Sequence, residues 1–342
     1  MKKNKLLITI CAVMMLTAAC KNQQKQEERL WTIKIEDKWG FIDKTGTIVI
    51  NPQFDYVDSF SEGLAAVSID RKFGFIDTQG KYIINPQFDY ASRFSEGLAA
   101  VIIDKQLGYI NKQGEIIINP QFDFAAYAMG NTISFSEGLA AVRKDRKFGF
   151  IDKSGEFVIN PQFSVAYPFS EGLAIVVIDH KFGFINKQGE FIINPQFDDA
   201  SSFSEGLAAV EIDEKLGYID KQGNFIIEPQ FDYALPFSEG LAMVKVGEYE
   251  EGKCGFIDKQ GNFIINPQFD YALSFSEGLA MVMTGGFVDG DCGFIDNQGN
   301  FVINPQFGWA GAFSGGLAEL SFRDGRQIGF IDKRGNLIYK AQ

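Results

Sequence analysis

The sequence predicts an all-β protein made of nine tandem units, each a three-stranded antiparallel β-meander. A signature of the form x-Gly-aromatic-Ile-Asp/Asn recurs nine times at spacings of 34 to 41 residues. A turn of constant length follows each signature, and the strands around it carry apolar residues on both faces. A chain of 342 residues with 46% hydrophobic residues can also bury a substantial core.

Each unit is predicted to contain three short strands joined by tight links. In the second unit the strands are 64–69, 73–76 and 81–85. Between the second and third strands, Asp77 opens a type I turn and Gly80 accepts the positive φ at its end. This link has the same length in all nine units, as a hairpin of fixed register requires. The nine signatures begin at Trp39, Phe73, Leu107, Phe148, Phe182, Leu216, Cys254, Cys292 and Ile328.

Strands that are apolar on both faces require each unit to pack against its neighbours. The start of the repeat region, LWTIKIEDK, aligns without gaps to LAAVSIDRK of the second unit. The repeat region therefore starts with a first strand and ends on a third strand, so no unit is completed by both termini. This frame, the nine units and the uneven links favour an open, twisted, solenoid-like array. A closed propeller-like ring is the alternative.

The repeated residues GFID…G…IINPQF…FSEGLA resemble those of WG-repeat proteins. That family is named for a Trp-Gly pair, which this chain keeps only at Trp39-Gly40. The resemblance covers about residues 30–342, and eight units have Phe, Leu, Cys or Ile at the Trp position. The resemblance implies a bacterial repeat protein and no particular activity.

Residues 1–19 have the pattern of a bacterial lipoprotein signal peptide. Three lysines precede an apolar run at 6–16, which is too short for a lasting membrane span. The Thr-Ala-Ala-Cys that follows resembles a lipobox, which implies cleavage before Cys20 and lipidation of that residue. Residues 20–29 are then the lipidated Cys and a polar tether, and residues 30–342 are the repeat domain.

The charge of the chain limits its expected partners. Without the signal it has 29 basic and 44 acidic residues, a net charge of −15. Nucleic acid is not an expected partner, because its binding requires Lys and Arg to neutralise phosphates. No basic patch for anionic lipid is expected, so the lipid anchor alone should contact the membrane. Lys21 is not the Asp that holds lipoproteins in an inner membrane, so we expect an outer-membrane or surface location in the bacterial cell envelope.

One position that varies within the repeat is the candidate for ligand contact. It follows the Asn-Pro-Gln-Phe motif by two residues and is aromatic in most units, although Val165 and Asp199 interrupt the series. Exposed rings there would stack on sugars or anchor a peptide, whereas buried rings would only pack one unit on the next. The candidate contact residues are Tyr56, Tyr90, Phe124, Tyr233, Tyr271 and Trp309.

The other repeated polar residues are expected to be structural. Ser-Glu-Gly occurs in seven units, the first at Glu62, and seven equivalent glutamates argue against one special acid–base pair. We expect Ser and Glu to cap backbone amides in a turn that Gly allows. His180 is the only histidine and stands in a hairpin turn, which argues against a Ser-His-Asp triad and a His-rich metal cluster. We predict no metal and no cofactor.

Cys254 and Cys292 occupy the Trp position of adjacent units. Adjacent units can bring two such residues together, and an exported protein permits a disulfide. Stacked sheets lie about 10 Å apart, however, and a bridge needs Cα atoms within about 7 Å. A disulfide and two separate buried thiols both stay open.

These observations predict a non-catalytic, lipid-anchored surface that binds a protein or a glycan. A hydrolase of the cell envelope, with carboxylates in an inserted loop, is the rival interpretation. A structural envelope component without a discrete ligand is the third. The carboxylates of the rival interpretation are Glu248, Glu250, Glu251, Asp289 and Asp291.

Overall fold

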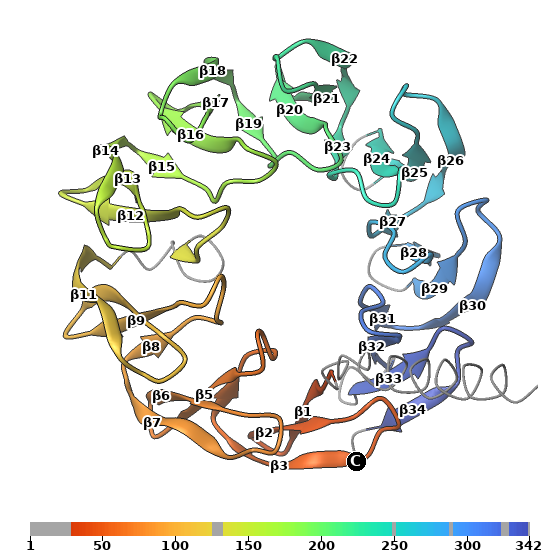
Figure 1. Ribbon diagram of the computed structural model, residues 1–342. Helices are drawn as coiled ribbons and strands as arrows, with labels where there is room; N and C mark the ends of the chain where they lie inside the picture. Colours follow the sequence, from red (N-terminus) through yellow and green to blue (C-terminus); the bar gives the residue numbers. More distant parts are fainter. Residues whose placement is uncertain (1–28, 125–132, 248–250, 287–289, 323–327, 341–342) are drawn as a thin grey trace, which may run out of the picture.

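The computed structural model describes residues 29–124, 133–247, 251–286, 290–322 and 328–340. Nine small antiparallel sheets form a closed ring, a nine-bladed β-propeller (Figure 1). The predicted all-β class, nine units and antiparallel meanders are confirmed. The ring is closed, as in our alternative prediction, and the favoured prediction of an open array is wrong. No helix in the described ranges is long and apolar enough to cross a membrane.

The segment predicted to be the signal peptide, 1–19, lies outside the described residues. So do Cys20 and the tether up to residue 28. Cleavage, lipidation and the envelope location therefore stay predictions.

Seven blades have four strands, and the other two have three among the described residues. A two-residue strand that we had predicted to be a link lies at one edge of each four-stranded blade. In the second blade it pairs with the next strand through Tyr56↔Ser68 and Val57↔Val67. These short strands lie toward the centre of the ring and the longest strands lie at the rim (Figure 1). The short strands are β4 (Tyr56–Val57), β8 (Tyr90–Ala91), β15 (Val165–Ala166), β19 (Asp199–Ala200), β23 (Tyr233–Ala234), β27 (Tyr271–Ala272) and β31 (Trp309–Ala310).

The remaining strands form three series that follow one another from the centre outward. The inner series is β1 (Trp31–Ile35), β5 (Ala65–Ile69), β9 (Ala99–Ile103), β12 (Ala140–Lys144), β16 (Ala174–Ile178), β20 (Ala208–Ile212), β24 (Ala242–Val246), β28 (Ala280–Thr284) and β32 (Leu317–Ser321). The middle series is β2 (Lys38–Ile42), β6 (Lys72–Ile76), β10 (Gln106–Ile110), β13 (Lys147–Ile151), β17 (Lys181–Ile185), β21 (Lys215–Ile219), β25 (Lys253–Ile257), β29 (Asp291–Ile295) and β33 (Ile328–Asp332). The rim series is β3 (Ile48–Phe54), β7 (Tyr82–Phe88), β11 (Ile116–Asp123), β14 (Phe157–Phe163), β18 (Phe191–Phe197), β22 (Phe225–Phe231), β26 (Phe263–Phe269), β30 (Phe301–Phe307) and β34 (Leu337–Lys340).

The glycine of the repeated signature is required inside the blade. A Cβ atom on Gly74 would lie 2.4 Å from the carbonyl oxygen of Ile84 and 2.6 Å from the nitrogen of Pro86. Both atoms belong to the rim strand of the same blade, where the pairing register shifts between Phe73 and Phe75. The close approach is thus between two strands of one blade, because the bulge that accommodates Pro pushes the rim strand toward the glycine.

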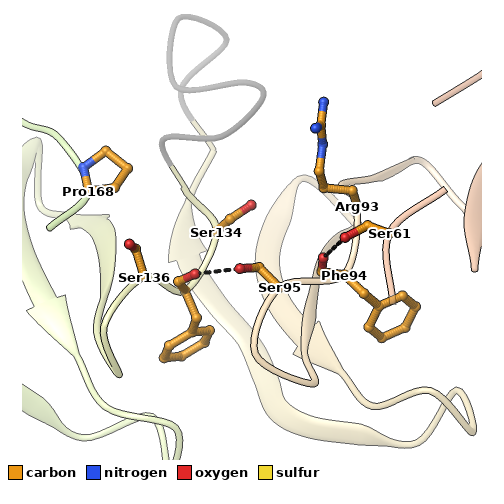
Figure 2. A pocket seen from close by; sticks show the side chains of 8 residues that line it. Ser61, Arg93, Phe94, Ser95, Ser134, Ser136 and Pro168 are labelled. Atoms are coloured by element: carbon orange, nitrogen blue, oxygen red, sulfur yellow. Dashed lines mark hydrogen bonds between the residues drawn. The ribbon is translucent and has the colours of Figure 1, made fainter. Parts of the chain in front are cut away.

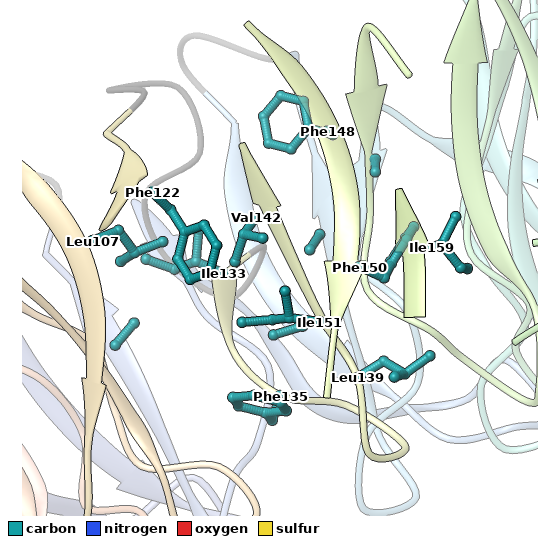
Figure 3. Packing of buried hydrophobic residues seen from close by; sticks show 14 of the residues in the cluster. Leu107, Phe122, Ile133, Phe135, Leu139, Val142, Phe148, Phe150, Ile151 and Ile159 are labelled. Carbon is teal, nitrogen blue, oxygen red and sulfur yellow. The ribbon is translucent and has the colours of Figure 1, made fainter. Parts of the chain in front are cut away.

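Neighbouring blades pack through their apolar faces. The largest buried cluster joins three consecutive blades and includes Phe122, Phe135 and Phe150 (Figure 3). The phenylalanine of each Ser-Phe-Ser-Glu-Gly-type loop lies against the middle strand of the preceding blade. The rings of Phe94 and Phe75, for example, are 4.8 Å apart. The core of the molecule is therefore a series of layers between blades, as strands with two apolar faces require.

A serine–glutamate clamp, formed by each Ser-Glu-Gly turn, joins one blade to the next. Ser61 Oγ donates to the carbonyl oxygen of Phe94 at 2.7 Å, and the amide of Gly97 donates to the Glu62 carboxylate at 3.2 Å. Lys112 Nζ lies 3.0 Å from Glu62 Oε2. The prediction that Ser and Glu cap backbone amides of their own turn is right only in part, because Glu accepts from an amide of the next blade and Ser donates to a carbonyl oxygen there. The clamp glutamates are Glu62, Glu96, Glu137, Glu171, Glu205, Glu239 and Glu277.

The clamp holds its glutamate in a conformation that few residues adopt. Glu62 has φ 53° and Gly63 has φ 86°, and Ser61 pairs with Leu64 across them. Two consecutive positive φ values are typical of a type I′ turn, in which a glutamate at the first central position is unfavourable by about 1 kcal/mol or more. The contacts of the carboxylate with the next blade offset this cost.

The ring closes through side-chain packing between its first and last blades. Ile33 and Ile42 form a buried cluster with Leu317 and Phe330. Trp31 Nε1 donates to the carbonyl oxygen of Ser314 at 3.0 Å. Ser314 belongs to the turn that, in the other blades, contacts the loop of the next blade. No described strand of the first blade pairs with the last. The ring thus closes without a blade that is built from both ends of the repeat region. We had taken the absence of such a blade as a sign of an open array, and this is why that prediction was wrong.

Cys254 and Cys292 are free, buried thiols. Each lies within hydrogen-bonding distance of a carbonyl oxygen of its own unit, that of Asp270 for Cys254 and that of Gly308 for Cys292. Burial raises the pKa of each thiol to about 11. Of the two states left open by the sequence, the structure contains the separate thiols.

We expect both thiols to be free in the purified protein and unreactive until it unfolds. Under denaturing conditions without reductant, an alkylating agent should label both peptides that contain Cys254 and Cys292, as measured by mass spectrometry. In the folded protein at about pH 8, labelling should be slow because little thiolate forms on a buried thiol with this pKa. Labelling that appears only after reduction would show a disulfide instead.

Replacing a clamp glutamate should weaken the ring. Glu171 accepts a hydrogen bond from the Gly206 amide at 3.0 Å and lies 3.2 Å from Lys221 Nζ. We expect Glu171→Gln to lower the free energy of unfolding by about 1 kcal/mol in urea titrations near neutral pH. Glu228→Gln is the matched control, because Glu228 is exposed at a position where other units have Asn.

The effect of Glu171→Gln should also depend on pH. Partial burial favours a higher pKa for Glu171, but the hydrogen bonds from Lys221 and Gly206 outweigh it and hold the pKa below its ordinary value of 4.5. A lowered folded-state pKa stabilises the protein above the unfolded-state value, and this contribution disappears as the pH falls through the folded-state value. The difference between wild type and variant should therefore shrink below about pH 4.5. A difference that is constant down to lower pH would contradict this account of the clamp.

Candidate binding edge at the centre of the ring

The short strands place one side chain outward and the next into the core. Tyr56 of β4 is 47% exposed, whereas its neighbour Val57 is 7% exposed. The alternation follows from the two-residue period of a strand. We call the surface formed by the short strands and the two residues that follow each of them the inner edge.

Five of the six candidate aromatic residues lie on this inner edge, and Phe124 follows the rim strand β11 instead. Their exposure divides the six into two groups. Tyr56, Tyr233 and Trp309 are 44% to 48% exposed. Tyr90, Phe124 and Tyr271 are half-buried. The exposed residues therefore fit the binding alternative, and the half-buried residues fit the packing alternative. The exposed group is available to a partner, and the half-buried group contributes to the contacts between blades.

Rings at the Trp position of the signature connect aromatic residues of neighbouring blades. Phe73 lies between Tyr56 and Tyr90, with ring centroids 5.8 Å and 5.6 Å away. These tilted pairs have the spacing at which aromatic rings attract one another. Phe73 thereby supports Tyr56 from one side and holds it at a fixed place on the inner edge.

Trp309 is positioned by a glycine of its own unit. A Cβ atom on Gly311 would lie 3.4 Å from Cη2 of Trp309. The six-membered ring of the indole thus lies beside Gly311, where other units have Asp, Ser, Ile, Tyr or Leu. The glycine leaves room for the large ring on the inner edge while 44% of Trp309 stays exposed.

The inner edge also carries charge at two places. Arg93 Nη2 lies 3.3 Å from Asp58 Oδ1, which joins the edges of two adjacent blades. In the blade that begins with β19, Asp199 pairs across the strands with Glu211. Burial and the nearby Asp199 charge raise the pKa of Glu211. The edge therefore differs in chemistry from blade to blade, although the blades share one backbone.

The inner edge varies from unit to unit, and only part of this variation was predicted from the sequence. The residue that precedes the loop phenylalanine differs among units as much as the aromatic candidates do, and it places Arg93 on the edge. Comparing every column of the repeat would have found it. That variable column contains Ser59, Arg93, Ser134, Pro168, Ser202, Pro236, Ser274 and Ala312.

The described carboxylates of the rival interpretation lie on two different blades. Glu251 lies in a turn just before β25 and Asp291 is the first residue of β29, whereas Glu248, Glu250 and Asp289 lie outside the described residues. His180 is exposed in a two-residue turn, as predicted. Within the described part of the chain, no group of three or more His, Cys, Asp or Glu residues could hold a metal ion.

Comparison with known families gives one clear match. The model of the WG containing repeat matches the chain eight times, and these matches cover most of the ring. No curated protein matches the chain. The matched segments are 39–73, 73–106, 108–148, 148–181, 182–215, 217–249, 255–286 and 293–321.

Several solved structures resemble the ring distantly. The dihydro-heme d1 dehydrogenase NirN is 14% identical with a TM-score of 0.49, over 92% of this chain and 73% of that chain. Kluyveromyces lactis Hsv2p is 10% identical with a TM-score of 0.43, over 77% of this chain and 91% of that chain. PorZ, a surface component of the type-IX secretion system of Porphyromonas gingivalis, is 10% identical with a TM-score of 0.34, over 91% of this chain and 51% of that chain. Likenesses this low carry no information about function.

Proposed function

The chain belongs to the family of proteins built from the WG containing repeat, and we propose that its propeller is a non-catalytic protein whose inner edge binds a protein or a glycan. The observation that carries the proposal is the exposure of Tyr56, Tyr233 and Trp309 at equivalent places on that edge. Large rings with half of their surface in water are the side chains that most often anchor a partner.

The distribution of variable residues supports the same proposal. Residues that build the blades, such as the clamp glutamates, repeat from unit to unit, whereas the inner edge changes. A surface that only packs blades together would have no reason to differ in charge and ring type along one edge. A partner that contacts several blades at once would need such differences for specificity.

A binding role fits the polar groups better than hydrolysis does. Each clamp glutamate holds an amide of the next blade, and most of them also lie within 3.2 Å of a lysine. A carboxylate that is fully engaged in the fold is not free to act as an acid or a base. The proposal therefore assigns no catalytic residue and no cofactor.

We also propose that the propeller acts in the bacterial cell envelope. This part of the proposal rests on the sequence pattern before Cys20. A lipid on Cys20 would hold the ring at a membrane surface through the polar tether.

Photocrosslinking tests the inner edge directly. A photoreactive phenylalanine analogue at position 309 should crosslink a discrete partner in living cells, detected as a shifted band and identified by mass spectrometry. The same analogue at position 302 is the matched control, because Val302 is 47% exposed and close in the chain but lies on the rim strand β30 of the preceding blade. Equal crosslinking at both positions would argue against the inner edge.

Substitutions then measure the contribution of each ring to the complex. With the partner in hand, Trp309→Ala and Tyr233→Ala should each weaken binding by about 10-fold or more, since buried aromatic anchors are typical hot spots. Val302→Ala and Ile226→Ala, with the same exposure at the rim, should leave the affinity unchanged. Loss of binding only in the rim variants would assign the partner to the outer surface.

A further inference from the structure

A pocket opens where the regular pattern of the inner edge is interrupted. Its volume is about 270 Å³, and its walls come from four consecutive blades (Figure 2). The blade formed by β12–β14 lacks a short strand among the described residues, whereas both of its neighbours have one. The pocket lies beside this blade. Its lining residues are Ser61, Arg93, Phe94, Ser95, Ser134, Phe135, Ser136 and Pro168.

Most of the pocket's hydroxyl groups can accept a hydrogen bond but have no proton left to donate. Ser61 Oγ donates to the carbonyl oxygen of Phe94 and Ser95 Oγ donates to that of Phe135, each at 2.7 Å (Figure 2). Ser136 Oγ donates in the same way to Phe169. A hydroxyl that donates its only proton keeps its lone pairs. These three serines therefore suit a ligand that carries hydroxyl groups of its own.

Ser134 differs from the other serines of the pocket. It is 9% exposed, and its buried Oγ has no hydrogen-bond partner among the described residues. Buried polar side chains in native proteins are nearly always satisfied by protein, water or a ligand. Figure 2 shows this hydroxyl between Arg93 on one side and Pro168 on the other. With a change of side-chain rotamer the hydroxyl would turn into the pocket, where it could both donate to a ligand and accept from one.

Arg93 is the one charged side chain that lines the pocket. Its contact with Asp58, at 3.3 Å, uses one of the five N–H groups of the guanidinium. A planar guanidinium binds a carboxylate through two parallel hydrogen bonds. The lining residues include no carboxylate, and the N–H groups of Arg93 that do not contact Asp58 favour an acidic ligand over a cation.

We propose that this pocket binds a small hydroxylated carboxylate, the chemical class of the uronic sugars. The carboxylate would face Arg93, and the ligand's hydroxyl groups would contact Ser134 and the lone pairs of the other serines. The volume fits one sugar unit. This site does not depend on the protein or glycan partner proposed for the exposed aromatic residues.

Calorimetry with the full chain and glucuronate as the probe tests the proposal. Glucuronate should bind saturably and at least about 10-fold more tightly than glucose, which lacks the carboxylate, or acetate, which lacks the hydroxyl groups. An oligomer of uronic acid in a parallel titration separates a free sugar acid from the same unit within a glycan. Absence of saturable binding at about 10 mM glucuronate, or equal binding of acetate or glucose, would overturn the proposal.

Variants locate the binding in the pocket. Arg93→Gln should weaken glucuronate binding by about 10-fold to 100-fold and Ser134→Ala by about 2-fold to 10-fold. Ser274→Ala is the matched control, since Ser274 is at the same position of the repeat in a distant blade, and it should bind normally. Arg93→Lys keeps the charge without the planar fork, so an intermediate affinity is expected.

Two further measurements complete the test. Thermal unfolding of each variant checks that the ring is intact. Trp309→Ala should bind glucuronate as wild type does, which separates this site from the proposed partner surface. Unchanged affinity in both Arg93→Gln and Ser134→Ala would show that glucuronate binds elsewhere.

Discussion

A blade of this protein has no polar face, and the rest of the structure follows from that constraint. The middle strands bury Phe and Ile on opposite sides, so a single blade in water would expose a large apolar surface. Burial of both sides is possible only when blades stand on both sides, and a ring gives this environment to every blade. The serine–glutamate clamp works within the same constraint. It fixes the distance between adjacent loops by hydrogen bonds that only a neighbouring blade can supply.

A shared scaffold of this kind separates the residues that build the ring from those that distinguish its blades. The core and the clamp repeat, while the inner edge and the loop residues beside it change. The pocket is an example, because two unlike residues, Arg93 and Ser134, make a local site beside a blade that has no short strand among the described residues. The exposed rings at Tyr56, Tyr233 and Trp309 use the regular backbone instead and differ only in side chain.

The repeat made much of the fold predictable, because its turns and its apolar strands obey local rules. Asp77 and Gly80 form the predicted turn, and five of the six candidate aromatic residues begin short strands on the inner edge. Two features depend on geometry that periodicity does not contain. Closure depends on the angle between successive blades. The pairing of Tyr56 with Ser68 depends on how the chain reverses in the turn between them. Arg93 and Ser134 occupy the same column of the repeat in consecutive units, so the pocket was missed because that column was not compared among units.

Closure by packing alone has a consequence for how such rings change over time. In this ring the first and last blades meet through Ile33, Ile42, Leu317 and Phe330, without exchanging a strand among the described residues. Each unit of sequence is then also a unit of structure, so duplication or deletion of one copy inserts or removes a whole blade without breaking another. The number of blades is free to follow the curvature that the interfaces prefer. A gene for such a protein can alter the diameter of its ring by recombination between its own repeats.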